Sequence, residues 1–182
     1  MAVSTVGVVG AGQMGSGIAQ VTAQAGVRVV MNDVSQEMCN HGLDAIGRNL
    51  DRMVQRGRFK PEERDRVIAR IETTTNLEDL ASADFVIEAV VENEDAKIGL
   101  FQKLDQLCPP EVIFASNTSS ISITRMVSRV SARTRSRYQY VAIYGPIACR
   151  DVRPTVDCLW APRIWPRTCL YPVLGPPAIS SP

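Results

Sequence analysis

Residues 10–20 read GAGQMGSGIAQ, and this segment is the strongest indication of the fold of the chain. A short apolar run at residues 6–9 precedes it. Apolar residues at helical spacing continue to Gly26, where glycine is typical of a helix end. A second run with strand character follows at residues 27–31. Strand, glycine turn, helix and strand in this order predict one βαβ unit, the element from which parallel sheets are built.

The three glycines of this turn have the spacing G-x-G-x-x-G, which between a strand and a helix indicates a dinucleotide site. Gly10 permits the tight turn, Gly12 lets the backbone approach a pyrophosphate, and Gly15 lets helix and strand pack closely. The helix that begins at Gln13 and Met14 offers free N–H groups and the positive end of its dipole to phosphates. The alternative is a glycine-rich turn that binds no ligand.

Asp33 closes the second predicted strand. A carboxylate at this position accepts hydrogen bonds from the hydroxyls of an adenine ribose and repels a 2′-phosphate. Val34 and Ser35 follow it rather than an arginine, so NAD is favoured over NADP. The alternative is that Asp33 or Ser35 caps the helix that comes next.

Strand and helix patterns alternate through the next hundred residues, which predicts the α/β class. The sheet should be mostly parallel and doubly wound, of the Rossmann type, with a helical pair inserted at residues 36–70. We expect helices at residues 36–55, from 61 to 71, at 77–81 and up to 107, and strands at residues 73–75, 84–90 and 112–115.

Two polar segments follow the ends of the last two predicted strands, and open α/β sheets bind ligands at that edge. Glu92 and Lys97 leave the strand at residues 84–90 and are candidates for the nicotinamide-ribose side. Acids in the first turn of a helix also stabilise it without any ligand, which is the alternative. Asn117 and Ser119, in the loop SNTSS, could hold a substrate oxygen, although polar loops are common.

The bulk composition gives little reason to expect a charged macromolecular partner. The chain has 182 residues, is 45% hydrophobic and carries a net charge of +1, which points to neither nucleic acid nor an anionic membrane. No apolar run approaches the roughly 20 residues that a bilayer requires, and no secretory signal is visible. The five cysteines lack C-x-x-C spacing, so we expect reduced thiols, a cytoplasmic protein and no metal site.

The composition changes near residue 125. Residues 124–182 carry 9 of the arginines, no lysine and 8 of the 11 prolines, and no glutamate follows Glu111. Prolines at this density interrupt any helix longer than about two turns. We therefore predict a dinucleotide-binding domain at residues 1–125 and an irregular, Arg- and Pro-rich tail at residues 126–182.

Four motifs in this order resemble the N-terminal NAD-binding domain of the 3-hydroxyacyl-CoA and 3-hydroxybutyryl-CoA dehydrogenases, over about residues 4–125. They are GAGQMGSGIAQ, the strand that ends in Asn32-Asp33, VIEAVVENEDAK and FASNTSSISIT. The related 6-phosphogluconate and 3-hydroxyisobutyrate dehydrogenases share the glycine fingerprint but lack the last two motifs. The resemblance implies an NAD site made by Gly10, Gly12, Gly15 and Asp33, with Glu92 and Lys97 near the nicotinamide ribose.

The resemblance also implies an acyl-CoA substrate. Ser119 would hydrogen-bond the 3-oxygen of the substrate, with Asn117 nearby, and the helical pair would face the CoA moiety. Arg48 and Arg52 on that pair are candidate partners of the CoA phosphates. The alternative is a solvated basic face. Members of the family dimerise through a second, helical domain, for which we find no counterpart in the tail.

The chain departs from this family in the segment that should carry the catalytic base. The family has a histidine in a His-Phe-x-Asn-Pro segment and a glutamate that orients it. The one histidine here is His41, expected at the surface, and residues 138–147 hold neither that histidine nor the asparagine. A reading frame lost near residue 125 would explain the tail, and a divergent tail is the alternative. We expect a dehydrogenase by descent that binds NAD with little or no turnover; a non-catalytic NAD-binding module or an inactive fragment are the alternatives.

Overall fold

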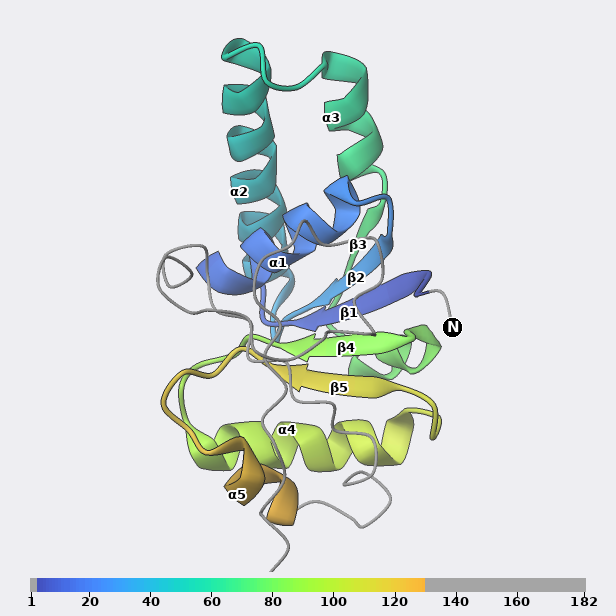
Figure 1. Ribbon diagram of the computed structural model, residues 1–182, viewed down its shortest axis with the longest axis vertical. Coiled ribbons are helices and arrows are strands. Elements are labelled where there is room, and N and C mark those ends of the chain that lie inside the picture. Colours follow the sequence, from blue (N-terminus) through green and yellow to red (C-terminus); the bar gives the residue numbers. More distant parts are fainter. Residues whose placement is uncertain (1–2, 130–182) are drawn as a thin grey trace, which may run out of the picture.

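A computed structural model of the chain describes residues 3–129. Five parallel strands form one sheet in the order β3-β2-β1-β4-β5, with helices on both faces (Figure 1). The elements are β1 (Thr5–Val9), α1 (Gln13–Gln24), β2 (Arg28–Asn32), α2 (Gln36–Gln55), α3 (Pro61–Ile68), β3 (Ile71–Thr74), η1 (Leu77–Ser82), β4 (Phe85–Glu88), α4 (Glu94–Leu107), β5 (Ile113–Ser116) and α5 (Ile123–Ser128). The predicted α/β class and Rossmann-type sheet are confirmed.

The core lies in two layers, one on each face of the sheet. Alternate residues of β1 belong to different layers, because successive side chains of a strand point to opposite faces. Val8 packs with α1 and α2, whereas Val9 packs with η1 and α4. Phe101 of α4 meets Phe114 of β5 edge to face in the second layer, with ring centroids 6.2 Å apart. The sheet is therefore covered on both sides, as its apolar strands require.

The register of the strands brings their carboxyl ends to one edge of the sheet. Val9 pairs with Asn32 on one side and with Glu88 on the other, and Glu88 pairs with Ser116. The loops after β1, β2, β4 and β5 therefore leave the sheet side by side. This edge carries both the glycine turn and the two polar segments singled out in the sequence.

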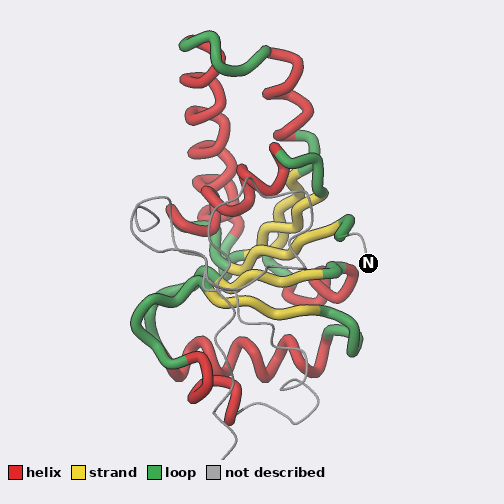
Figure 2. The backbone as a smooth tube through the Cα atoms, viewed as in Figure 1, coloured by secondary structure: helices red, strands yellow, loops and turns green. Residues whose placement is uncertain are grey.

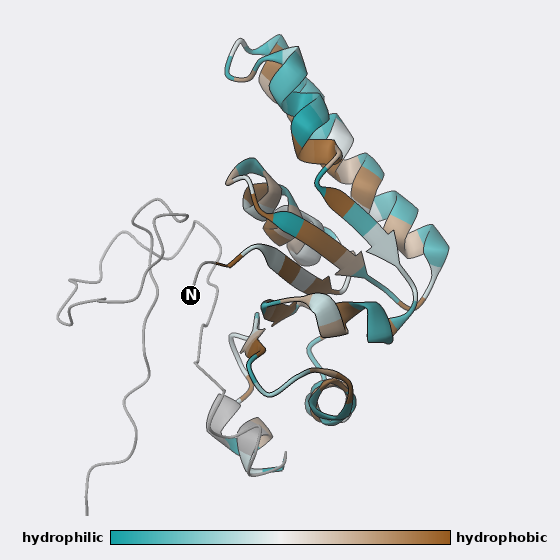
Figure 3. Ribbon diagram, turned by 90° about the vertical axis from the view of Figure 1, so that its right-hand side faces the viewer, coloured by the Kyte–Doolittle hydropathy of each residue, from teal (hydrophilic) through white to brown (hydrophobic). Residues whose placement is uncertain are grey.

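The helical pair inserted between β2 and β3 projects from the sheet (Figures 1 and 2). Ser35 begins α2 by accepting a hydrogen bond from the amide of Met38 at 3.2 Å, and Pro61 occupies the first position of α3. The far end of the pair is mostly hydrophilic (Figure 3). Arg64 of α3 forms an ion pair with Asp51 of α2 at 3.0 Å, which links the two helices.

Several predicted boundaries are wrong. Ile71 was assigned to the apolar face of a helix, but α3 ends at Ile68 and Ile71 begins β3, where it pairs with Val29. The strand predicted at residues 84–90 ends at Glu88. The side chain of Glu88 accepts a hydrogen bond from the amide of Val90 at 2.7 Å, so this amide does not continue the ladder of the sheet.

The predicted domain boundary at residue 125 falls inside α5, which continues to Ser128. This helix lies against α4 (Figure 1). Arg125 forms an ion pair with Glu94 at 2.9 Å, and Gln102 donates a hydrogen bond to the carbonyl of Arg129 at 3.1 Å. The rest of the predicted tail lies outside the described residues.

No helix within residues 3–129 is long and apolar enough to span a membrane.

Candidate functional site

The glycine turn has the shape that the sequence predicts, and two of its glycines are required by the fold itself. Gly10 has a φ of +103°, and a Cβ there would lie 2.5 Å from the carbonyl oxygen of Ala89. A Cβ on Gly15 would lie 1.7 Å from the carbonyl oxygen of Gly10. At Gly12, by contrast, a Cβ would meet nothing within 4 Å. Gly12 therefore faces open space, which leaves room for a ligand to approach the backbone.

The N-terminus of α1 opens at this turn without a side-chain cap. Gly12 is the N-cap residue and has no side chain that could cap the helix, and the first turn holds no acidic residue. Gln13 and Met14, the first two residues of the helix, are exposed. The first amides of an α-helix have no partner within the helix, and they carry the positive end of its dipole. An anionic diphosphate is the ligand that this arrangement suits.

Asp33 lies beside the turn and is fastened to it. One oxygen of its carboxylate accepts a hydrogen bond from the amide of Ala11 at 2.6 Å, and the other accepts one from the amide of Val34 at 2.7 Å. Ser35, and not Asp33, caps α2. Asp33 is half-buried and follows the carboxyl end of β2, at the edge of the sheet where a ribose could reach it.

Gly42 also helps to shape the turn after β1, and the sequence patterns did not predict this role. A Cβ on this α2 residue would lie 2.7 Å from the carbonyl oxygen of Ala11 and 3.1 Å from the Cε atom of Met31. The glycine lets α2 close against the turn after β1. A glycine inside a strongly helical pattern was the available signal, because it costs about 1 kcal/mol relative to alanine unless packing requires it.

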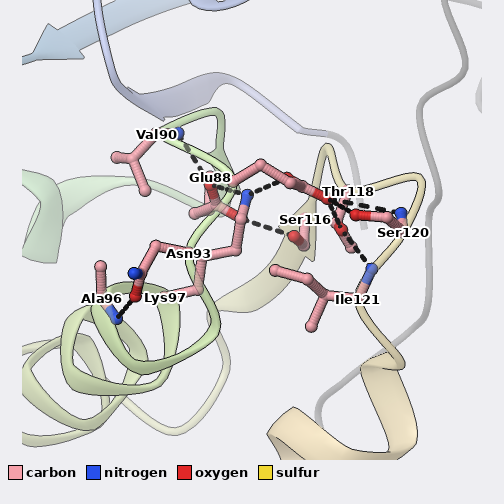
Figure 4. A network of polar contacts seen from close by, with 10 residues as sticks. Glu88, Val90, Asn93, Ala96, Lys97, Ser116, Thr118, Ser120 and Ile121 are labelled. Atoms are coloured by element: carbon pink, nitrogen blue, oxygen red, sulfur yellow. Dashed lines mark hydrogen bonds and ion pairs between the residues drawn. The ribbon is translucent and has the colours of Figure 1, made fainter.

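A network of polar contacts joins the loops after β4 and β5 (Figure 4). Glu88, the last residue of β4, accepts hydrogen bonds from the ammonium of Lys97 at 2.6 Å and from the hydroxyl of Ser116 at 2.5 Å. The side chains of Glu88 and Lys97 are both 0% exposed. Lys97 also pairs with the carboxylate of Glu92 at 3.2 Å. The lysine therefore lies between two carboxylates, one inside the protein and one at its surface.

Glu92 connects this network to the loop after β5. Its carboxylate accepts hydrogen bonds from the hydroxyl of Thr118 and from the hydroxyl of Ser120, the latter at 2.8 Å. Partial burial opposes ionisation, but these bonds and the charge of Lys97 prevail and lower the pKa of Glu92 to about 2. Its side chain is 40% exposed, so a charged acceptor faces solvent at this edge.

The structure brings Glu92, Lys97 and the loop at residues 116–120 together. The amide of Asn117 donates to the carbonyl of Glu88 at 2.8 Å, and Ser119 is exposed. Glu88 was not among the predicted site residues, and Ser116 and Thr118 were predicted only as members of the polar loop SNTSS. The signal for Glu88 was an acid inside an apolar strand, because a buried charge must be paired.

Arg48, Arg52 and His41 lie apart from this network. All three are exposed on α2, and the two arginines stand on the part of the chain that projects from the sheet. The surface position predicted for His41 is confirmed. Residues 138–147, where the resemblance led us to expect a catalytic base, lie outside the described residues.

Comparison with known proteins agrees with this geometry. Residues 5–142 match the family described as the NAD binding domain of 3-hydroxyacyl-CoA dehydrogenase. The chain belongs to the 3-hydroxyacyl-CoA dehydrogenase family. The resemblance inferred from the four motifs is therefore confirmed, and so is NAD as the cofactor of this domain. The match extends past residue 125, the point at which the composition changes.

Named relatives of this dehydrogenase family share both sequence and fold with the chain. A probable 3-hydroxybutyryl-CoA dehydrogenase of Deinococcus radiodurans is 47% identical over 122 residues, which cover 67% of this chain and 44% of that protein. The structure of FadB2 from M. tuberculosis aligns with a TM-score of 0.76 at 40% identity, covering 81% of this chain and 51% of that one. The structure of (S)-3-hydroxybutyryl-CoA dehydrogenase PaaH1 from Ralstonia eutropha aligns with a TM-score of 0.75 at 38% identity, covering 80% and 51%. The chain thus spans about half the length of these relatives.

Proposed function

We propose that this chain binds NAD across the carboxyl edge of its sheet, with the diphosphate at the N-terminus of α1. The uncapped first turn of that helix carries the proposal, together with the open space at Gly12. Gln13, Met14 and Gly15 supply the amides of this turn. NAD, when bound, supplies the acceptor for a hydride, and the residues of the chain bind and orient it.

The two ribose sites follow from the carboxylates at this edge. Asp33 accepts hydrogen bonds from the hydroxyls of the adenine ribose, and its negative charge disfavours the 2′-phosphate of NADP. Glu92 accepts hydrogen bonds from the nicotinamide ribose, with Lys97 beside it. The exposure of Glu92 supports this role, because its carboxylate offers a charged acceptor at the carboxyl edge of the sheet.

We further propose that the domain serves the oxidation of a 3-hydroxyacyl-CoA by NAD, as the printed names of its relatives suggest. Ser119 and Asn117 lie beside the nicotinamide side of the site and would hydrogen-bond the 3-oxygen of the substrate. Arg48 and Arg52 would meet the CoA phosphates from the helical pair. Dimerisation through the family's second domain and a cytoplasmic location stay predictions from the sequence.

A second proposal is that this chain binds NAD with little or no turnover. The observation that favours it is the single histidine, because His41 is exposed on α2 and no glutamate follows Glu111. Removing a general base typically lowers an enzymatic rate by about 10²–10⁴-fold. Residues 138–147, where the resemblance leads us to expect the base, contain Tyr138, Tyr140 and Tyr144. A tyrosine replaces a histidine base poorly, because an ordinary pKa of about 10 leaves the phenol protonated at neutral pH.

Binding of NADH and reduction of acetoacetyl-CoA by NADH together test whether the chain binds the cofactor and whether it turns over substrate. The full chain should bind NADH while its turnover stays far below that of an intact relative assayed in parallel. Turnover equal to the relative's would exclude the second proposal and support a competent dehydrogenase. Absence of NADH binding by folded protein would exclude both.

A further inference from the structure

Glu88 lies at the centre of the polar network in Figure 4, yet it is too deeply buried to touch a ligand. Its carboxylate contacts three separate segments of the chain. It accepts from the amide of Val90 after β4, from the ammonium of Lys97 on α4 and from the hydroxyl of Ser116 on β5. A buried carboxylate is costly unless it is paired and hydrogen-bonded, and these three donors satisfy it. Any effect of Glu88 on a ligand must therefore pass through its neighbours.

Lys97 lies closer to the carboxylate of Glu88 than to that of Glu92. Its ammonium lies 2.6 Å from Glu88 and 3.2 Å from Glu92, and the shorter contact is the stronger charge-assisted hydrogen bond. The lysine is 0% exposed, whereas the side chain of Glu92 is 40% exposed. Two carboxylates thus face one ammonium, and the ammonium is drawn towards the buried one. Negative charge is left on Glu92, at the surface.

We propose that Glu88 is a positioning residue for the nicotinamide half of the cofactor site. It holds Lys97 inward, so that the carboxylate of Glu92 stays available to accept hydrogen bonds from the ribose hydroxyls. Through Ser116 it also fixes the start of the loop that carries Asn117 and Ser119. This inference rests on the proposed function, in which the nicotinamide ribose lies at Glu92. With a neutral group at position 88, the ammonium would move towards Glu92 and compete with those hydroxyls.

The test compares NADH with ADP as ligands of the full chain carrying Glu88→Gln. ADP contains the adenine, its ribose and the diphosphate, but it lacks the nicotinamide half. The variant should bind NADH about tenfold more weakly, the loss expected when one charge-assisted hydrogen bond is weakened. It should bind ADP within about twofold of the wild type, because the glycine turn and Asp33 are unchanged.

Glu111→Gln is the matched control, because it makes the same chemical change at an exposed residue in the loop before β5, at the opposite edge of the sheet. It should bind both ligands as the wild type does. Ser116→Ala is a second variant for the case that Glu88→Gln does not fold. It removes one partner of Glu88 without changing any charge, and it should weaken NADH but not ADP.

Two results would overturn the inference. One is a folded Glu88→Gln variant that binds NADH as tightly as the wild type. The other is an equal loss of NADH and ADP affinity in both Glu88→Gln and Ser116→Ala, which would indicate a general structural role. A folded wild type that binds neither ligand would contradict the proposed function itself.

Discussion

The carboxylate of Asp33 accepts a hydrogen bond from the backbone amide of Ala11 across 2.6 Å. The residue expected to recognise the adenine ribose therefore also fastens the glycine turn against which the diphosphate would rest. Recognition of one part of the cofactor and the shape of the site for another part depend on the same side chain. Substitutions at Asp33 should affect both.

Asp33→Ala should lower the free energy of unfolding by about 1–3 kcal/mol, because the amides of Ala11 and Val34 lose their acceptors. NADH affinity should fall as well. Asp33→Asn keeps a neutral acceptor but loses the charge, so it should retain more stability while discriminating less against NADPH. Thermal unfolding and titrations with both dinucleotides measure these effects. Asp44→Ala, at an exposed residue of α2, is the control, and equal stability of Asp33→Ala and the wild type would contradict the expectation.

Gly15→Ala should destabilise the fold by about 3 kcal/mol or more, because its Cβ would meet the backbone of Gly10. NADH binding should be lost with the turn. Gly17→Ala is the control on the same helix, where a Cβ meets nothing within 4 Å. It should be neutral or raise stability by up to about 1 kcal/mol, as alanine does in helices. Similar melting temperatures for the two variants would show that the turn is not packed as described.

Glu92 should make stability depend on pH in the acid range. Its pKa is lowered from an ordinary 4.5 to about 2, so its contribution is complete above about pH 4.5 and is lost as the pH falls towards 2. The pKa of Asp84 is also lowered, by the amides of Thr5 and Ser4, so the wild type alone does not isolate Glu92. The unfolding free energies of the wild type and Glu92→Gln should therefore converge as the pH falls. Parallel curves over this range would count against the described contacts of Glu92.

Lys97→Met should cost about 3–5 kcal/mol of stability, because it leaves the carboxylate of Glu88 buried without its counterion. Adding Glu88→Gln to it should recover part of this loss, since no unpaired charge then remains. Lys103→Met, at an exposed position of the same helix, should change stability by no more than about 0.5 kcal/mol. Chemical denaturation of the wild type, Lys97→Met, Glu88→Gln and the double variant completes the cycle, and additive effects of the two buried substitutions would disprove the coupling.

The two halves of the site differ in how far the sequence could predict them. The turn from Gly10 to Gly15 and the position of Asp33 depend on local spacing along one βαβ unit, so the pattern was sufficient. The network at Glu88 depends on Ser116, 28 residues further along the chain, and on Lys97 folding back from α4. Nothing in the local pattern of β4 shows such partners. The acid in an apolar strand could be noticed, but what pairs with it follows only from the packed structure.

The start of β3 and the role of Gly42 were missed for the same kind of reason. Ile71 fits a helical stripe by its spacing from Val67 and Ile68, and only its pairing with Val29 assigns it to the sheet. Gly42 is required by an approach of α2 to Ala11, a contact across 31 residues of sequence. Local periodicity predicts the type of an element better than its ends or its tertiary contacts.

Isothermal titration of NADH into the full chain measures whether the turn at the N-terminus of α1 binds the cofactor. We expect one saturable site per chain in the wild type, competition by ADP for that site, and no binding by Gly15→Ala. The proposed site would be wrong if folded wild-type protein, verified by a cooperative melt, released or absorbed no heat with NADH and gained no thermal stability from it.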